Sequence, residues 1–586
     1  MQVSKLSYVS DFEATNERET NHVWSWESLV VGDTENPIRG TDINSFLSWV
    51  SCTDKTVFFH NLKYDSSYIL SELFKRGYEH VEDKKKLSNK KLTTLISDMG
   101  IYYSITVQFE TGAIVEFLDS YKLISLPVRK IAQAYGLPMS KGEIDYNADR
   151  PIGYTPTDEE WDYVHRDVSI VSLALAQLFE QGFDKITQTS NALNDMIETL
   201  GGKKKFKRYF PTLEEDIDSF VREGYLGGAA QVNELYKGKE VGRGRVYDVN
   251  SEYPWAMREK MLPFGKPVWF DGKYTYDEDY PLFFIKFECM FELKDRHLPT
   301  VQAKHIPRFK KDKFLRSSYG RVVTLTLTSI DYEMFFKHYE VTCVKYIGGY
   351  KFMASDKILR PYIDKWYSVK EQASIDKNAG LRTIAKDMLN KPSGKFGTKP
   401  KVCSKIPYYD EKIRYKLSDI EDRESVYVPL IAYVTAYGRE LCISHAQANY
   451  DRFLYMDTDS NHYLGDYPVE GLPVDNKKLG YFKHESTFSR AKFLHAKCYV
   501  EETITNEKEK SYAIENEEKT EKDYYYNSEN ELVYLKVTVA GLPSNCHNQV
   551  TIENFQVGAE YEGKLRPYMT PNGQILEECN FKIREN

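Results

Sequence analysis

The sequence predicts a multidomain α/β protein, and three observations carry this prediction. Its 586 residues are enough for about three or four domains. Short apolar runs at residues 56–59 and 453–456 are typical of buried strands. Residues 381–390 instead place apolar side chains at i, i+3, i+4, i+7 and i+8, which is the spacing of an amphipathic helix.

Composition indicates a globular protein from the reducing interior of a cell. The chain is 41% hydrophobic, its mean hydropathy is −0.55, and no apolar run is long enough to span a bilayer. Nothing near the N-terminus resembles a signal peptide. The eight cysteines form no C-x-x-C pair, which argues against structural zinc and against a disulfide framework.

Charge is distributed unevenly along the chain. The net charge of −8 argues mildly against a nucleic-acid partner, but a binding groove needs only a local basic lining. Basic runs lie at residues 84–91, 203–208 and 304–316. The run at 203–208 lacks apolar periodicity and predicts a linker or an exposed edge. Acidic residues gather at 501–531, where we expect a solvated insertion.

Carboxylates near the N-terminus are spaced so that they can meet. Asp11 and Glu13 follow a predicted strand at residues 5–9 and are two positions apart, so they lie on one side of an extended chain. Asp65 follows the strand at residues 56–59, in a turn or helix. Each of these carboxylates, taken singly, is more often an ordinary surface residue.

A third element adds to this set. Tyr163 and Asp167 are four positions apart in the helical segment 159–181, so they share a helix face. Four carboxylates from three separated elements suit two metal ions about 3.5–4 Å apart, which clamp the attacking and leaving oxygens of a phosphodiester. The sequence therefore predicts a phosphodiester-cleaving site in the first third of the chain.

A second acidic pair follows the strand at residues 453–456. In an extended chain Asp457 and Asp459 face one point, and two such charges repel unless a cation lies between them. Mg²⁺ takes carboxylate oxygens and keeps positions open for substrate phosphates. The alternative is an acidic hairpin turn, since Asp and Thr are common turn residues.

Two other segments place charged residues at the end of a predicted strand and along one face of a predicted helix. Asp248 closes a β-rich run that reaches a proline at residue 254. On the predicted helix 381–390, Arg382, Lys386 and Asn390 recur every four residues, opposite the apolar face. Cations along one helix stripe suit a triphosphate. A solvated charged face is the alternative.

The N-terminal residues resemble a known domain. The order D-x-E, N-x-x-x-D and Y-x-x-x-D is similar to the three motifs of the 3′–5′ proofreading exonuclease domain of replicative DNA polymerases. The resemblance implies an RNase H-like fold with a mostly parallel sheet for residues 1–190. Lys141 is similar to the catalytic lysine of the protein-primed branch, where it would stabilise charge on the leaving group. By the same resemblance, the single-stranded primer end is contacted by His60, Asn61, Tyr64, Ser120 and Leu123; core packing is equally consistent with Tyr64 and Leu123.

The remainder resembles the polymerase half of the protein-primed family B DNA polymerases of the phi29-type bacteriophages. Motif A (D-x-x-S-x-Y-P) matches at Asp248, Ser251 and Tyr253, motif B at Lys386 and Asn390, and motif C at Asp457 and Asp459. The resemblance implies two Mg²⁺ ions per site, which Mn²⁺ can replace, held here by Asp248, Val249, Asp457 and Asp459. It implies dNTP contacts from Ser251, Tyr253, Arg382, Lys386 and Asn390. A buried core tyrosine is the alternative for Tyr253.

Three shorter motifs imply contacts with DNA. They are Y-x-G-G at Tyr225, Gly227 and Gly228, T-x-x-G-R at Thr435 and Arg439, and K-x-Y at Lys497 and Tyr499. Paired glycines allow a backbone to approach a ligand closely, although a plain turn would also use them. In the family these motifs contact the template strand or the primer end.

Motif B departs from the family pattern K-x-x-x-N-S-x-Y-G. Ser393 stands where the family usually places a tyrosine over the nascent base pair, and Pro392 should end or kink the helix. Lys386, Asn390 and Gly394 are kept. We therefore expect working nucleotide binding with an altered base-pair platform.

The resemblance covers nearly the whole chain and implies a right-hand polymerase with two insertions. The implied parts are the exonuclease domain at 1–190, a linker and the first part of the palm at 191–260, the first insertion at 261–357, the fingers at 358–394, the second insertion at 395–420, the rest of the palm at 421–530 and the thumb at 531–586. The first insertion would contact a priming protein, and the second would close a ring around DNA.

The expected function is DNA-directed synthesis with proofreading, in replication of a linear viral genome. Expected partners are a primer–template, dNTPs, a terminal protein that serves as primer, and a single-stranded-DNA-binding protein, with a monomeric enzyme in the host cytoplasm. One rival is an exonuclease whose polymerase half only binds DNA, favoured by Pro392 and Ser393. A second rival is a binding or packaging protein, which the two sets of carboxylates oppose.

Overall fold

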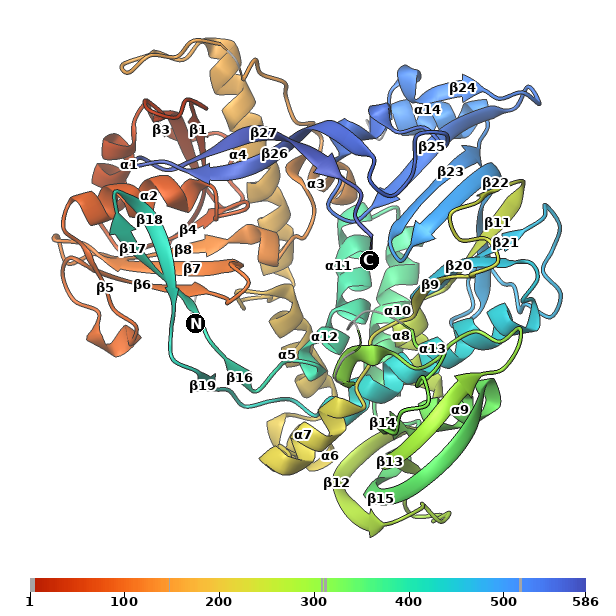
Figure 1. Cartoon of the computed structure of the whole chain (residues 1–586). Coiled ribbons are helices and arrows are strands. Elements are labelled where there is room, and N and C mark those ends of the chain that lie inside the picture. The colour runs from red at the N-terminus through yellow and green to blue at the C-terminus, as the bar shows by residue number, and fades with distance from the viewer. Residues whose placement is uncertain (1–5, 147, 307–308, 310–313, 516–518, 586) are drawn as a thin grey trace.

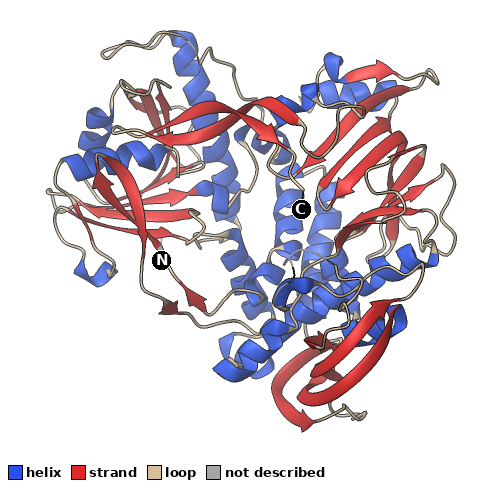
Figure 2. Cartoon of the chain, in the orientation of Figure 1, coloured by secondary structure: helices blue, strands red, loops and turns tan. Residues whose placement is uncertain are grey.

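The computed structural model describes residues 6–146, 148–306, 309, 314–515 and 519–585. Lys5, the first residue of the predicted strand 5–9, lies outside these ranges. The chain forms two large sheets on either side of a group of central helices, with a smaller sheet below them (Figure 1). Figure 2 shows how the helices gather between the sheets. Within the described residues, no helix is long and apolar enough to cross a membrane.

The N-terminal sheet has eight strands in the order β3-β2-β1-β4-β8-β7-β6-β5. Its strands are β1 (Ser7–Ala14), β2 (Val23–Val30), β3 (Ile38–Gly40), β4 (Lys55–Phe59), β5 (Glu79–His80), β6 (Lys91–Ile96), β7 (Tyr102–Gln108) and β8 (Ile114–Asp119). Only β1–β4, β4–β8 and β5–β6 pair in parallel. The expectation of a mostly parallel sheet was therefore wrong. Short connections join β6, β7 and β8, and such connections allow only antiparallel neighbours, whereas parallel pairing needs a crossover.

Helices cover this sheet and complete its cores. The long helix α4 (Asp158–Glu180) packs on β1 and β2, and α2 (Asp65–Lys75) packs beside α1 (Ile43–Val50). The sequence predicted α4 to within one residue at each end. Its start has a capping box, in which the Thr157 hydroxyl accepts from the N–H of Glu160 and the Glu160 carboxylate accepts from the N–H of Thr157.

The C-terminal sheet has nine antiparallel strands in the order β24-β25-β23-β22-β11-β21-β20-β9, with β10 paired to β22. These are β9 (Ala230–Val232), β10 (Glu240–Val241), β11 (Gly244–Val249), β20 (Phe453–Asp457), β21 (Ser460–Leu464), β22 (Phe482–His495), β23 (Cys498–Ile504), β24 (Tyr524–Tyr526) and β25 (Leu532–Val539). Helix α13 (Val428–Ala448) packs on β20 and β21 and on α8 (Glu252–Glu259). The central strands β11 and β21 bring residues 248 and 460 into register.

The central helices include the predicted amphipathic segment. Helix α11 (Ala379–Asn390) packs on α10 (Arg360–Ile375) and on α5 (Gln188–Thr199), and its residues Ile384, Ala385, Met388 and Leu389 are buried as expected. Pro392 ends this helix, also as expected, and begins the short helix α12 (Pro392–Phe396). Proline is favoured at that first helical position because its missing N–H is not needed there.

Two inserted elements project from the central body. The first is a four-stranded sheet in the order β12-β15-β13-β14, with α9 (Ser329–His338). Its strands are β12 (Leu262–Asp271), β13 (Leu282–Leu293), β14 (Val323–Thr328) and β15 (Tyr339–Ser355). The second is a pair of ribbons, β16–β19 (Lys401–Val402, Glu421–Asp422) and β17–β18 (Lys405–Asp410, Lys412–Leu417). The β17–β18 ribbon lies against α2 and β6 of the N-terminal domain.

A last hairpin closes the arrangement into a ring. Strands β26 (Glu560–Met569) and β27 (Gln574–Lys582) cross from the C-terminal sheet to the N-terminal domain (Figure 1). There the Tyr68 hydroxyl donates to the backbone oxygen of Gln574 at 2.8 Å. At the hairpin's tip, the ammonium of Lys412 lies 4.9 Å from the ring centre of Tyr568. The tip of the second insertion therefore meets the tip of this hairpin.

Two segments differ from expectation. The basic run 203–208 is most of helix α6 (Lys203–Tyr209) and not a linker, and Phe206 is buried against Phe210 and Phe396. The five basic side chains of this run are exposed, in line with the other alternative of an exposed edge. A helix of seven residues, about two turns, is too short to show clear periodicity in the sequence. The acidic region 501–531 is not solvated throughout, because Glu501 and Glu502 lie in β23 and are 0% and 2% exposed.

Candidate active sites

The first carboxylate set is brought together on three elements, as the spacing predicted. Asp11 and Glu13 lie on β1, Asp65 opens α2, and Asp167 lies on α4. The backbone N–H of Phe12 donates to Asp65 Oδ1 at 3.3 Å, which fixes β1 against the start of α2. Tyr163 lies one turn before Asp167 on α4 and is buried like it.

Lys141 completes this set from a loop. Its ammonium lies 2.5 Å from Asp167 Oδ2 and 5.2 Å from the ring centre of Tyr163. Burial lowers the pKa of Lys141, but Asp167 outweighs burial and the net pKa is raised, so the amine stays protonated. The hydroxyls of Tyr146 and Tyr163 lie 2.7 Å apart. Sequence reasoning gave no role to Tyr146, because only folding brings its loop back onto α4.

The electrostatics of this site favour a cation. Burial, followed by repulsion from Asp167, raises the pKa of Asp11 to about 7. Burial and then Asp11 likewise raise the pKa values of Glu13 and Asp65. Oδ1 of Asp167 is buried and has no hydrogen-bond partner among the described residues. Such carboxylates retain their charge near neutral pH when a metal ion supplies the missing positive charge.

The second site is a cavity of about 550 Å³ between the C-terminal sheet and the central helices. Asp248 and Asp459 line it from the sheet, and Lys386 and Asn390 line it from α11. The remaining lining residues are Val249, Ser251, Glu252, Tyr253, Lys370, Leu389, Ser393, Thr458 and Glu485. The cavity thus gathers residues from all three segments that the sequence connected.

Asp457 does not face this cavity together with Asp459. Asp457 ends β20, and Thr458 and Asp459 form the two-residue turn before β21, with Thr458 at φ +60°. Alternate residues share a side only along an extended strand, and Asp459 lies in the turn, so Asp459 lines the cavity and Asp457 does not, although the charge of Asp457 still acts on Asp459. Asp457 instead lies near Lys497, with its Oδ1 3.7 Å from Nζ, and accepts a 3.3 Å hydrogen bond from the Tyr455 hydroxyl.

Asp248 and Asp459 are the two aspartates that line the cavity. Burial, followed by the charge of Asp459 and then that of Glu485, raises the pKa of Asp248 to about 7. Burial also raises the pKa of Asp459, with Asp457 as a further cause. No group of three or more His, Cys, Asp or Glu side chains forms a ready metal cage among the described residues. Paired carboxylates of this kind suit Mg²⁺, which fills its remaining positions with water and substrate phosphates.

The cations of α11 are joined by one that sequence reasoning missed. Lys370 of α10 lines the cavity, and its pKa is lowered by burial and then by the charges of Arg382 and Lys386. Arg382 is exposed one turn from Lys386 and is not part of the cavity wall. Lys370 stands in no motif, and only the packing of α10 on α11 reveals it.

Two further carboxylates were also missed. Glu485 of β22, the strand next to β11, lines the cavity, and its charge helps to raise the pKa values of Asp248 and Asp459. Glu252 is 3% exposed and its carboxylate lies directly against Gly438, where an added Cβ would stand 2.6 Å from Oε2. Burial, then Asp459, raises the pKa of Glu252 well above its usual value. Glycine at 438 is therefore required by close approach, not by helix geometry.

The Y-x-G-G segment lies beside the motif C turn. A Cβ added to Gly228 would stand 2.6 Å from Thr458, whereas Gly227 is exposed and has open space beside it. The N–H of Thr458 donates to the backbone oxygen of Ala229 at 2.7 Å. Tyr225 is partly buried, with the ammonium of Lys304 5.0 Å from its ring centre. The loop can thus present the backbone of Gly227 to a ligand.

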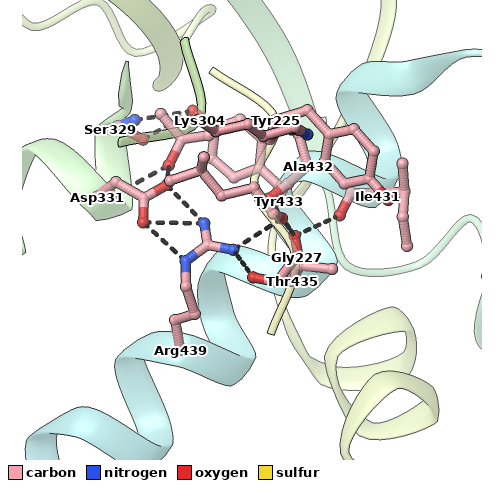
Figure 3. A network of polar contacts seen from close by, with 12 residues as sticks. Tyr225, Gly227, Lys304, Ser329, Asp331, Ile431, Ala432, Tyr433, Thr435 and Arg439 are labelled. Carbon is pink, nitrogen blue, oxygen red and sulfur yellow. Dashed lines mark hydrogen bonds and ion pairs between the residues drawn. The ribbon is translucent and has the colours of Figure 1, made fainter. Parts of the chain in front are cut away.

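Thr435 and Arg439 are buried behind this loop (Figure 3). The Thr435 hydroxyl donates to the backbone oxygen of Leu226 at 2.7 Å, and Arg439 Nη1 donates to Leu226 and Gly227 at 2.9 and 2.6 Å. The predicted direct grip on a template strand is therefore not available to these side chains in this structure. They hold the loop from inside the protein.

The five residues expected at the single-stranded primer end differ in how exposed they are. Asn61 is exposed, and Tyr64 is partly buried beside Asp65. Ser120 and Leu123 are buried, Leu123 within the core. His60 lies between Ser120 Oγ at 3.0 Å and the backbone oxygen of Leu126 at 2.7 Å. For Leu123 the packing alternative describes the structure best.

The K-x-Y residues also differ in exposure. The Lys497 side chain is 60% exposed, and its ammonium reaches toward Asp457. Tyr499 is 7% exposed and packs in the sheet behind Tyr455. Lys497 can therefore meet a ligand directly, whereas Tyr499 supports it from below.

Comparison with known proteins identifies relatives of this chain. The family model for type B DNA polymerases, organellar and viral, matches residues 50–154 and 143–467. The DNA polymerase of Bacillus phage phi29 is 37% identical over 98% of this chain and 99% of its own length, and that of Streptococcus phage Cp-1 is 31% identical over 99% and 98%.

Solved structures show the same likeness in three dimensions. Phi29 DNA polymerase in an orthorhombic crystal form has a TM-score of 0.90 and 35% identity, covering 99% of this chain and 100% of that one. Its complex with primer–template DNA and incoming nucleotides has a TM-score of 0.90 and 36% identity over the same shares. The chain therefore belongs to the organellar and viral type B DNA polymerases and is a DNA-directed DNA polymerase of the phi29 kind, with an exonuclease domain and a right-hand polymerase domain.

Proposed function

We propose that the two sites perform opposing reactions on one primer end. At the cavity of Asp248 and Asp459, a primer 3′-hydroxyl attacks the α-phosphate of a dNTP and releases pyrophosphate. At the site of Asp11, Glu13 and Asp167, water attacks the terminal phosphodiester and releases a mismatched nucleotide, which is 3′–5′ proofreading. Positioning and charge stabilisation supply most of the rate in such reactions.

Both sites suit Mg²⁺, two ions at each, or Mn²⁺ in its place. The residues that would hold them are Asp248, the backbone of Val249, Asp457 and Asp459 in the polymerase domain, and Asp11, Glu13, Asp65 and Asp167 in the exonuclease domain. When bound, the ions would offset phosphate charge and lower the pKa of a coordinated water or hydroxyl. Because Asp457 lies outside the cavity wall, Asp248 and Asp459 form the primary pair.

The protein's own groups supply the rest of the chemistry. Lys370 and Lys386, with Arg382 beside them, neutralise the triphosphate, and Asn390 orients it. Tyr253 lines the cavity where a sugar would lie and excludes a 2′-hydroxyl by bulk, while Ser251 contacts the phosphates. In the exonuclease site, protonated Lys141 stabilises the leaving alkoxide, and Tyr163 orients the attacking water.

The same proposal includes protein-primed, strand-displacing replication of a linear viral genome in the host cytoplasm. The first insertion, at residues 261–357, would receive a terminal protein. The second insertion and the β26–β27 hairpin would enclose DNA in the ring that Lys412 and Tyr568 close. The enzyme would act as a monomer, with a single-stranded-DNA-binding protein on the displaced strand. The phi29 polymerase structures with primer–template and with single-stranded DNA support both DNA-binding modes.

One observation carries the proposal: the carboxylates Asp248 and Asp459 share a cavity with Lys370, Lys386 and Asn390. A polymerase half that only bound DNA would not need this combination. The rival function, an exonuclease with an inactive polymerase half, is favoured only by the departure at Pro392 and Ser393, of which Ser393 lines the cavity.

A gel assay on a labelled primer–template with Mg²⁺ tests the proposal. Without dNTPs the primer should shorten, and with all four dNTPs it should extend fully. Shortening in both lanes would overturn synthesis and favour the rival function. Protein priming is then tested by incubating the enzyme with a terminal protein and the first dNTP. Attachment of the nucleotide to a hydroxyl of that protein is the expected result.

A further inference from the structure

A buried histidine–carboxylate pair lies behind the motif C hairpin. His462 of β21 and Glu501 of β23 are 1% and 0% exposed, and His462 Nδ1 lies 2.6 Å from Glu501 Oε1. The second oxygen of Glu501 is buried without a hydrogen-bond partner among the described residues, and the ammonium of Lys536 is 3.9 Å away. Burying a carboxylate with so few partners is costly. Neither residue belongs to a motif or lines a reaction site.

Three aromatic rings enclose the His462 imidazole. The ring centres of Tyr455 and Tyr499 both lie 5.3 Å from it, and that of Phe493 lies 5.5 Å from it. The planes meet at 66–79°, the edge-to-face geometry that aromatic pairs prefer. The hydrogen bond between Glu501 and Nδ1 of His462 fixes the tautomer of the imidazole and the orientation of its ring.

One of these three rings, that of Tyr455, contacts the candidate primer-end site. The Tyr455 hydroxyl accepts from the N–H of Lys497 at 2.9 Å and donates to Asp457 Oδ2 at 3.3 Å. Lys497 adopts φ +56°, a strained conformation for a lysine. Tyr455 therefore joins the K-x-Y turn to the motif C carboxylate, and His462 packs against its ring.

We propose that Glu501 and His462 are positioning residues for the primer terminus. Glu501 orients His462, His462 keeps the Tyr455 ring in place, and the Tyr455 hydroxyl sets Lys497 against Asp457. This inference rests on the proposed function, in which Lys497 contacts the primer end. It adds a support that acts through the rings, without touching DNA or nucleotide.

A double-mutant cycle on the full-length protein tests the inference. Glu501→Leu, Tyr455→Phe and the double variant are compared by KM for primer–template, KM for dNTP and kcat. Each single change should raise the primer–template KM about tenfold, the scale of one charge-assisted hydrogen bond, and leave the dNTP KM within about twofold. The double variant should be no worse than Tyr455→Phe, because both changes remove one pathway.

Two further variants make the outcome specific. Glu501→Gln keeps an acceptor for His462 and should restore the wild-type KM. Glu502→Leu is the matched control: it removes the next carboxylate of β23, which is also buried but bonds Arg490 and Ser489. Its primer–template KM should stay within about twofold of wild type, the range of an unrelated site.

The results distinguish a failure of the positioning role from a failure of the proposed function. Multiplicative losses in the double variant, or an equal effect of Glu502→Leu, would overturn the positioning role. If wild type fails to extend primers at all, the proposed function falls instead. Degradation of single-stranded DNA, which uses the distant Asp11 site, verifies that every variant is folded.

Discussion

Arg439 of α13 and Asp331 of α9, the helix of the first insertion, form a buried two-pronged ion pair (Figure 3). Nη2 of Arg439 lies 2.7 and 2.9 Å from the two carboxylate oxygens, and Nε lies 3.1 Å from Oδ1. Because Nη1 also donates to the backbone oxygens of Leu226 and Gly227, the Arg439 side chain joins α13, the first insertion and the Y-x-G-G segment.

Arg439→Ala should therefore destabilise the protein severely. Removing one partner of a buried ion pair leaves Asp331 uncompensated, which costs about 3–5 kcal/mol. Urea denaturation measures the loss. Lys207→Ala breaks the ion pair of Lys207 with Glu424, whose side chains are both 62% exposed, and serves as control. It should change stability by less than about 1 kcal/mol. Equal losses in the two variants would contradict the bridging role.

The two reactions should separate by mutation. Asp459→Ala removes a carboxylate of the cavity and should reduce primer extension at least about a hundredfold, since several kcal/mol of charge stabilisation are lost. Asp457→Ala should also abolish synthesis, and both variants should still degrade single strands. The double variant Asp11→Ala with Glu13→Ala should behave in the opposite way. Loss of both activities in either type of variant would show that the sites are not independent.

Metal-free protein should lose stability as pH rises. The pKa of Asp248 is about 7 in the folded chain and about 4 when unfolded, so between these values only the unfolded state releases the proton. The stabilisation that protonated Asp248 gives to the folded state is complete below about pH 4 and is lost as pH rises through about 7. Chemical denaturation with EDTA at pH 5 and pH 8 measures it.

Asp248→Asn should weaken this pH dependence, because the amide does not titrate. Mg²⁺ should stabilise wild type at pH 8 more than this variant, because binding to the folded state alone shifts the unfolding equilibrium. An unchanged difference between pH 5 and pH 8 in the variant would show that other groups cause the trend. Asp195→Asn changes a carboxylate that does not line the cavity, and provides the comparison.

The serine of motif B should affect fidelity. Ser393 is 8% exposed, lines the cavity, and its hydroxyl donates to the backbone oxygen of Asn390 at 2.7 Å. Ser393→Tyr puts a ring beside Tyr253 and should lower misinsertion about two- to tenfold, the worth of one aromatic contact. Single-nucleotide insertion kinetics with matched and mismatched dNTPs measure it. Unchanged fidelity would mean that this position is not the base-pair platform.

The contact between Lys412 and Tyr568, which closes the protein ring around DNA in the proposed function, should control processivity. Tyr568→Ala removes the ring over Lys412, an interaction worth about 0.5–1 kcal/mol at exposed sites, so product length per binding event should fall about two- to fivefold. Extension in the presence of a DNA trap measures it. The dNTP KM should not change, since the cavity is untouched; a change there without shorter products would oppose this role.

Local spacing in the sequence was sufficient to identify both carboxylate sets, the α11 helix and its end at Pro392. The pairs Asp11 and Glu13, and Tyr163 and Asp167, and the apolar face of α11 each lie within one element, where strand and helix periodicities apply. Tertiary structure alone decided that Asp459, not Asp457, faces the cavity, because the hairpin turn replaces the extended chain. It also placed Lys370 and Glu485 in the cavity and buried Arg439 and Glu501. Those outcomes depend on partners distant in sequence, whose approach is set by the packing of helices and sheets and leaves no periodic signal in the chain.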